Sequence, residues 1–184
     1  MNKTDLIHGK IIDLYGQTAL RKSALNIRGG AGVFEQVLAG KGYRTILEIG
    51  TYKGCSSAAM AQYCDRVITI DLAKGKLEWN GVEFDRQAFW DSLGVKNIEF
   101  HAVKDDAEKK MLVDSLDFDF AFIDGAHDRT VADDFAITKR CGKVLFHDAD
   151  DNGPNKSNCV YEFISSLPKD QVEFIDIFAL WTAK

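Results

Sequence analysis

A carboxylate and two glycines follow the start of an apolar, β-branched stretch in the sequence LEIGTYKG, residues 47–54. Glu48 lies two positions before Gly50, and Gly54 follows at a GxxxG spacing. Glycines are needed where a ligand approaches the backbone or a helix packs closely, because a side chain would block that approach. A dinucleotide-binding turn would read GxGxxG and place a pyrophosphate on the N–H groups that open the next helix. Glu48 would repel a pyrophosphate, so this turn suits a ligand with an ammonium or sulfonium group.

Two later apolar runs, FIDGAHD and FHDADDN, end in acids and histidines. Asp124 and Asp148 in these runs lie 24 residues apart, which leaves room for one helix between two parallel strands. The carboxyl ends of neighbouring parallel strands share one edge of the sheet, where ligands bind in open α/β folds. We therefore expect the two acids to lie together. His127 and His147 are candidate general bases, because histidine has the side-chain pKa nearest to 7.

The elements that position these residues alternate between β-branched runs and helical patterns. Five runs read as parallel strands: RTILEIG, RVITIDL, NIEFHAV, FDFAFIDG and GKVLFHD. Helices are predicted between and after them, near residues 55–64, 84–93, 106–115, 129–140 and 158–167. This alternation predicts an α/β fold with a parallel sheet built by right-handed crossovers. Several runs are apolar almost throughout, so the sheet must be covered by helices on both faces, which is a doubly wound arrangement.

The two ends of the chain differ from this repeat. VEFID and ALWTAK follow one another too closely for a helix, and they read as an antiparallel β-hairpin that completes a seven-stranded, Rossmann-like sheet. Residues 1–40 read as N-terminal helices, with the loop NIRGGAG between them, and residues 41–184 form the core. A chain of 184 residues that is 46% hydrophobic and 28% charged is predicted to form a single domain over residues 1–184.

Charge and cysteine usage limit the partners and the compartment. A net charge of −5 and the lack of any Lys/Arg block argue against a nucleic-acid partner. The four cysteines show no CxxC spacing, and the N-terminus lacks the apolar core of a signal peptide, so we expect a cytoplasmic protein. No window approaches the roughly 18 apolar residues of a membrane span. The number of subunits stays open, with a homodimer as one alternative.

Four motifs, followed by the terminal hairpin, together resemble a class I S-adenosylmethionine (SAM) dependent methyltransferase. They are ExGxxxG in LEIGTYKG, an acid at Asp71 that closes the second strand, FIDGAHD and VLFHD. The similarity runs from about Ala31 to the C-terminus. EIGTYKGCSS and FIDGAHD most resemble the small-molecule O-methyltransferases of the catechol, caffeoyl-CoA and macrolide-sugar type. The resemblance implies transfer of the SAM methyl group to a hydroxyl oxygen of a small-molecule acceptor.

The resemblance also implies where SAM would bind. Glu48 would lie near the methionine moiety, with a structural acid bonded to backbone N–H groups as the alternative. Asp71 would accept both ribose hydroxyls, one on each oxygen, unless it only caps a helix. Asp105 or Asp106 would contact the adenine edge, with a helix cap as the alternative. The predicted cofactor-binding residues are Glu48, Gly50, Thr51, Tyr52, Gly54, Asp71, Leu72, Asp105, Asp106 and Asp124.

Relatives that use a divalent metal imply a Mg²⁺ site at Asp124 and Asp148, because Mg²⁺ prefers oxygen ligands. The metal would bind the acceptor hydroxylate and lower its pKa. This chain has His147-Asp148-Ala149 where such relatives have paired acids or Asp-Asn, so Asp151 or Asn152 could complete the site. Without a metal, a histidine would act as the base. The predicted catalytic residues are Asp124, His127, His147 and Asp148.

Several residues have a structural interpretation as well as a functional one. Trp79 and Trp90 flank the connection after Asp71, and core packing is favoured for both over covering the adenine or the substrate. Asp128, Asp133 and Asp134 read as a solvated helix start. Two rival functions remain: a noncatalytic SAM-binding protein, and an NAD(P)-dependent oxidoreductase, which the missing GxGxxG disfavours.

Overall fold

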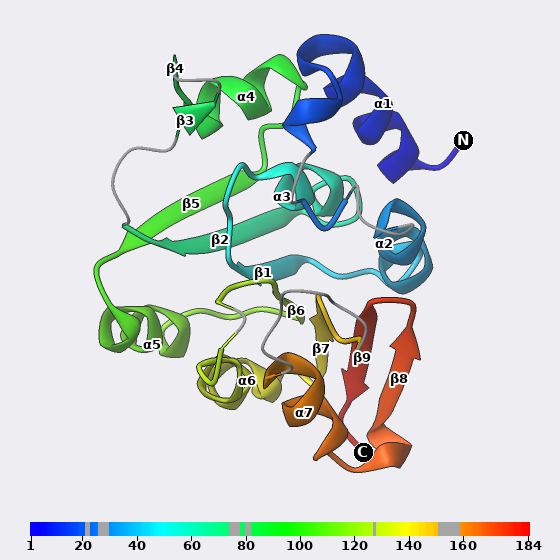
Figure 1. Ribbon diagram of the computed structural model, residues 1–184, viewed down its shortest axis with the longest axis vertical. Coiled ribbons are helices and arrows are strands. Elements are labelled where there is room, and N and C mark those ends of the chain that lie inside the picture. The colour runs from blue at the N-terminus through cyan, green and yellow to red at the C-terminus, as the bar shows by residue number, and fades with distance from the viewer. Residues whose placement is uncertain (21–22, 26–29, 74–77, 80–81, 127, 151–158) are drawn as a thin grey trace.

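A seven-stranded sheet forms the centre of the computed structural model (Figure 1). The structure describes residues 1–20, 23–25, 30–73, 78–79, 82–126, 128–150 and 159–184. The strand order is β5-β2-β1-β6-β7-β9-β8. The strands are β1 (Thr45–Ile49), β2 (Arg66–Leu72), β5 (Ile98–Val103), β6 (Phe120–Ile123), β7 (Lys143–Phe146), β8 (Val172–Ile175) and β9 (Phe178–Thr182).

The sheet is parallel except at its C-terminal end. β1 pairs in parallel with β2 and β6, β2 with β5, and β6 with β7, whereas β9 is antiparallel to both β7 and β8. The predicted doubly wound sheet with a terminal antiparallel hairpin is therefore confirmed. In the register, Ile49 at the end of β1 lies beside Ile70 of β2 and Ile123 of β6. The segments that follow these three strands consequently begin at the same edge of the sheet.

Helices pack on both faces of the sheet, so the sheet separates the hydrophobic core into two layers. One layer contains α1 (Lys3–Tyr15), α2 (Gly30–Leu38), α3 (Cys55–Met60) and α4 (Arg86–Ser92), packed against alternate strand residues such as Ile46. The other contains α5 (Asp106–Asp114), α6 (Val131–Thr138) and α7 (Cys159–Ser165), packed against residues such as Leu47. Successive strand side chains point to opposite faces, so nearly continuous apolar strands serve both layers.

Two features differ from the prediction. Gly30, Ala31 and Gly32 belong to α2 and not to the predicted loop, because the helical apolar spacing of Val33, Phe34, Val37 and Leu38 extends back to them. The connection after β2 also contains a two-stranded antiparallel hairpin, β3 (Glu78–Trp79) with β4 (Val82–Glu83), that the sequence did not predict.

The predicted helices near 55–64, 84–93, 106–115, 129–140 and 158–167 are all found, each shorter than expected. Short 3₁₀ helices occupy Gln17–Ala19, Lys139–Cys141 and Lys169–Gln171. Trp90 is 1% exposed and Trp181 is 8% exposed, so both belong to the core, as predicted for Trp90. The side chain of Trp79 lies outside the described part of the chain. No helix within the described ranges is long and apolar enough to cross a membrane.

Candidate active site

A cavity of about 350 Å³ opens at the carboxyl ends of β1, β2 and β6. Six of the predicted cofactor-binding residues line it: Gly50, Tyr52, Asp71, Leu72, Asp106 and Asp124. A much smaller space of about 10 Å³ lies beside it and shares Tyr52 and Asp124 with it. Thr51 and Gly54 line this smaller space, whereas Glu48 and Asp105 line neither.

Gly50 lets the turn after β1 touch the end of β6. Its φ is +98°, and a Cβ at this position would lie only 2.2 Å from the carbonyl oxygen of Asp124. The N–H of Gly50 donates to the carbonyl of Ile70 at 2.9 Å, and the N–H of Asp124 donates to the carbonyl of Ile49 at 2.8 Å. These contacts draw the ends of three strands together, and only glycine fits at their centre.

Gly54 is required by the packing of α4 against the turn. Its φ is +73°, and a Cβ would lie 2.5 Å from the Trp90 ring, whose Nε1–H donates to the Gly54 carbonyl at 2.9 Å. The structure therefore shows a helix-packing role for Gly54, and its predicted role in cofactor binding stays a prediction.

Replacing Gly54 by alanine is expected to destabilise the fold by roughly 1–3 kcal/mol, because the new methyl group displaces the buried Trp90 ring. Gly94→Ala is a matched control: Gly94 has φ +76° but open space where a Cβ would stand. Urea unfolding should show a clearly larger loss for Gly54→Ala than for Gly94→Ala. Equal losses in the two variants would mean that the Trp90 contact contributes nothing.

Glu48 is fully buried beneath the start of α3. Its carboxylate accepts hydrogen bonds from the hydroxyls of Ser56 (2.5 Å), Ser57 and Thr69 (2.6 Å), so its partners are side chains and not backbone N–H groups. Burial raises the pKa of Glu48 to about 7, although these three hydrogen bonds act to lower it. The predicted proximity of Glu48 to a methionine moiety stays a prediction.

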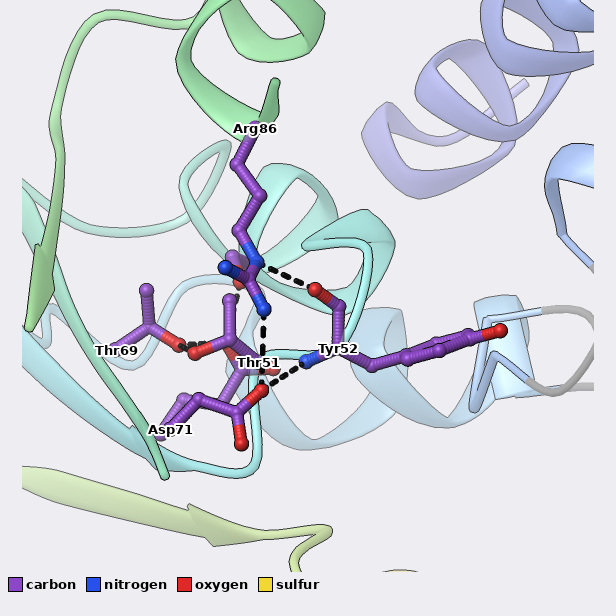
Figure 2. Close-up of polar contacts among 7 residues, drawn as sticks. Thr51, Tyr52, Thr69, Asp71 and Arg86 are labelled. Carbon is purple, nitrogen blue, oxygen red and sulfur yellow. Dashed lines mark hydrogen bonds and ion pairs between the residues drawn. The ribbon is translucent and has the colours of Figure 1, made fainter. Parts of the chain in front are cut away.

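Asp71 is held at the cavity by the neighbouring turn and by α4 (Figure 2). Its Oδ2 accepts the N–H of Tyr52 at 2.9 Å and pairs with Nη2 of Arg86 at 3.2 Å. Among the described residues, the first helix after β2 is α4, and its N-cap is Asp85, whose side chain accepts the N–H of Ala88. The alternative in which Asp71 caps a helix is thus wrong. The buried residue Thr51 precedes Tyr52 in this turn, and its hydroxyl is hydrogen-bonded to the hydroxyl of Thr69 at 2.7 Å.

Asp105 and Asp106 have separate places in the structure. Asp105 caps α5 by accepting the N–H of Glu108 at 2.8 Å. Asp106 lines the cavity and pairs with Nζ of Lys109 at 2.8 Å. If either acid contacts an adenine edge, the geometry favours Asp106.

Lys109 and Asp134 form a buried ion pair in the cavity wall that the sequence did not predict. Nζ of Lys109 lies 2.6 Å from Oδ1 of Asp134, and their side chains are 9% and 1% exposed. Burial alone would lower the pKa of Lys109, but its contacts with Asp106 and Asp134 outweigh burial and raise that pKa. The interpretation of Asp134 as part of a solvated helix start is therefore wrong. Asp133, its neighbour, is exposed.

The ends of β6 and β7 bring Asp124, His147 and Asp148 together, as expected from their positions in the sequence. Nδ1 of His147 lies 2.8 Å from Oδ1 of Asp124 and 3.4 Å from Oδ2 of Asp148. His147 and Asp148 are buried, and Asp148 has a φ of 56°. The imidazole thus stands between two carboxylates that would otherwise repel each other. His127, Asp151 and Asn152, which were also considered, lie outside the described residues.

Comparison with known families decides the class of protein. A family described as a methyltransferase domain matches residues 47–149, which run from within β1 to just past the end of β7 and include Asp71, Asp124 and Asp148. The chain belongs to this family. The predicted membership is therefore confirmed. No curated protein sequence gave a significant match.

Three solved structures of methyltransferases with bound SAM or SAH share the fold of this chain. The O-methyltransferase TomG from Streptomyces achromogenes, involved in tomaymycin synthesis and solved with SAM, is 17% identical, with a TM-score of 0.60 over 98% of this chain and 90% of that one. An O-methyltransferase from Bacillus cereus, solved with S-adenosylhomocysteine (SAH), is 16% identical, with a TM-score of 0.57 over 100% and 92%. The SAH-bound methyltransferase PaMTH1 from Podospora anserina is 16% identical, with a TM-score of 0.60 over 99% and 87%.

The methyltransferase-family chain also offers donors that fit a divalent cation. Asp124, His147 and Asp148 each supply one ligand atom, and these atoms lie within 4.8 Å of one another. Two carboxylates suit Mg²⁺, and the imidazole extends the choice to Mn²⁺ or Zn²⁺. A metal at this position stays a prediction.

Proposed function

We propose that this protein transfers the methyl group of SAM to a hydroxyl oxygen of a small molecule. The observation that carries the proposal is the cavity of about 350 Å³ in which Gly50, Asp71 and Asp124 meet at one edge of the sheet. The cavity supports a nucleoside ligand because Asp71 offers a carboxylate to the ribose hydroxyls. Asp124, a proposed catalytic residue, lines the same cavity. Structures of the same fold hold SAM or SAH, which supports the choice of cofactor.

In the proposed reaction, an oxygen lone pair of the acceptor forms a bond to the methyl carbon as the carbon–sulfur bond breaks. The electron pair of that bond stays on sulfur and yields SAH, while the hydroxyl proton passes to a base. The sulfonium is already a good leaving group. The protein has mainly to align oxygen and methyl carbon, exclude water and take the proton.

The base proposed for this step comes from the cluster of Asp124, His147 and Asp148. Two carboxylates facing Nδ1 of His147 keep the hydrogen on that nitrogen, which leaves Nε2 as the proton acceptor. Nε2 is buried and makes no hydrogen bond within the described part of the chain. A divalent cation held by Asp124, Asp148 and His147 would instead lower the pKa of a bound hydroxyl group.

Transfer of the labelled methyl group from SAM to a panel of catechols, phenols and sugar hydroxyls tests the reaction. The proposal expects SAH to form only when an acceptor is present. SAM binding without turnover across the panel would favour the rival interpretation of a noncatalytic SAM-binding protein. We place the reaction in the cytoplasm, which agrees with free thiols at Cys55, Cys64, Cys141 and Cys159.

Replacing Asp71 by alanine is expected to weaken SAM binding by about tenfold or more, because a charged hydrogen-bonding site is worth roughly 1.5–3 kcal/mol. The fold should persist, since Asp71 is partly exposed at the cavity. Asp105→Ala is the matched control, because Asp105 caps α5 and does not line the cavity. A dissociation constant that is unchanged in Asp71→Ala, or equally raised in both variants, would remove Asp71 from the cofactor site.

A further inference from the structure

Arg86 makes an unusual set of contacts at the first position of α4. A cation in the first turn of a helix is electrostatically unfavourable, because the N-terminus carries partial positive charge. Arg86 is nevertheless half-buried, with a side chain that is 19% exposed, and its guanidinium stacks 4.5 Å from the centre of the Phe100 ring. Its place therefore depends on specific partners elsewhere in the fold.

Those partners are the two residues that hold the edge of the cavity (Figure 2). Nε of Arg86 donates to the carbonyl oxygen of Tyr52 at 2.5 Å, and Nη2 pairs with Oδ2 of Asp71 at 3.2 Å. Tyr52 closes the ring of contacts, because its own N–H donates to the same Oδ2 at 2.9 Å. Tyr52 has a φ of 45°, a conformation that a non-glycine residue keeps only when its surroundings hold it.

The two carboxylate oxygens of Asp71 differ in their contacts. Oδ2 takes both the Tyr52 N–H and the Arg86 guanidinium. Figure 2 shows the other oxygen turned away from both partners, and no hydrogen bond to it occurs among the residues that the structure describes. Asp71 lines the cavity and Arg86 does not. Arg86 thus contacts the Asp71 carboxylate from outside the cavity lining.

We propose that Arg86 is a positioning residue that orients Asp71 toward the ribose of the cofactor and so sets selectivity for a nucleoside with free 2′ and 3′ hydroxyls. The inference rests on the proposed function. The planar fork of arginine suits this task, since it bridges a carboxylate and a carbonyl in fixed directions. The two contacts of Oδ2 also revise the expected ribose contact, because they leave one oxygen of Asp71, and not two, without a protein partner among the described residues.

Binding of SAH and of its 2′,3′-dideoxy analogue by the full-length protein tests the proposal. In the wild type, the analogue should bind about tenfold more weakly, because it cannot donate to Asp71. In Arg86→Met, SAH should lose about tenfold in affinity and the analogue little, so that the two ligands bind within about threefold of each other. Asp71→Asn should lower the ratio of the two dissociation constants, that of the analogue to that of SAH, in the same way.

Two further variants make the result specific. Arg66→Met removes a similar arginine–carboxylate pair, with Glu99 on β5, whose side chains are 46% and 42% exposed, and it should leave the ratio at its wild-type value. Arg86→Lys keeps the charge but lacks the fork, so its ratio should also fall, and this variant decides the matter if Arg86→Met does not fold.

A ratio that stays near tenfold in the Arg86 variants, whatever their absolute affinities, would overturn the proposal, because a purely structural role weakens both ligands equally. That failure is distinct from failure of the proposed function. A wild-type protein that does not bind SAH would sink both, whereas a wild type that binds SAH with an Arg86-independent ratio would sink only the positioning role.

Discussion

Replacing Asp124 and Asp148 together by alanine is expected to lower the rate of methyl transfer by at least about 100-fold, a far larger effect than any loss of SAM affinity. The two acids lie at the ends of β6 and β7, where they hold the His147 ring at 2.8 and 3.4 Å. Their loss removes the partners of the proposed base and the two oxygen donors of any metal. Steady-state rates and SAM titration on the same preparation separate catalysis from cofactor binding.

The matched control for this double variant is Asp133→Ala, which removes an exposed acid from α6 and should leave the rate unchanged. If the alanine double variant does not fold, the double variant Asp124→Asn, Asp148→Asn keeps the side-chain volume and serves in its place. A chelator then separates the two mechanisms. Metal-assisted transfer should stop when the chelator is added and return with added Mg²⁺, whereas transfer that uses the histidine alone as the base should survive the chelator. Full activity in both double variants would place the chemistry elsewhere in the cleft.

Lys109→Met is expected to reduce the free energy of unfolding by about 3–5 kcal/mol, because it leaves the buried carboxylate of Asp134 without its cation. The loss should shrink as the pH falls, since a protonated Asp134 carries no charge to be buried. Urea unfolding at several pH values measures both effects. The double variant Lys109→Met, Asp134→Leu should recover much of the loss, because replacing both partners by apolar groups is often neutral.

Lys110→Met is the control for Lys109→Met. Lys110 is the next residue, and its pair with Asp114 is exposed, with side chains that are 61% and 48% exposed. Exposed pairs of this kind contribute about 0–1 kcal/mol, so Lys110→Met should be nearly neutral. Similar stability for Lys109→Met and Lys110→Met would mean that Lys109 and Asp134 are solvated in solution.

The fold was predictable because its strands and strand ends have local signals. The β-branched runs fix the positions of β1, β2, β5, β6 and β7, and the parallel topology then places Asp71, Asp124 and Asp148 at one edge. The short spacing of the last two runs identified the antiparallel hairpin. The β3–β4 hairpin escaped prediction because each of its strands has only two residues, too few for a periodic pattern.

The parts of the site that the sequence did not reveal depend on contacts between distant elements. Lys109 and Asp134 read as ordinary polar helix residues, and only the packing of α5 beside α6 buries them. The packing role of Gly54 becomes visible only when Trp90 is placed against it. Arg86 left one local signal, a cation directly after the N-cap Asp85, where the helix dipole disfavours it. A cation at a position where the helix dipole disfavours positive charge indicates that Arg86 has a specific partner elsewhere in the fold.

Isothermal titration of the wild-type protein with SAH and with NADH tests the cofactor assignment most directly. The proposed site predicts binding of SAH at one molecule per chain, with an affinity at least tenfold higher than that for NADH, since the turn lacks the GxGxxG that receives a pyrophosphate. Binding of NADH as tight as that of SAH, or tighter, would contradict the assignment.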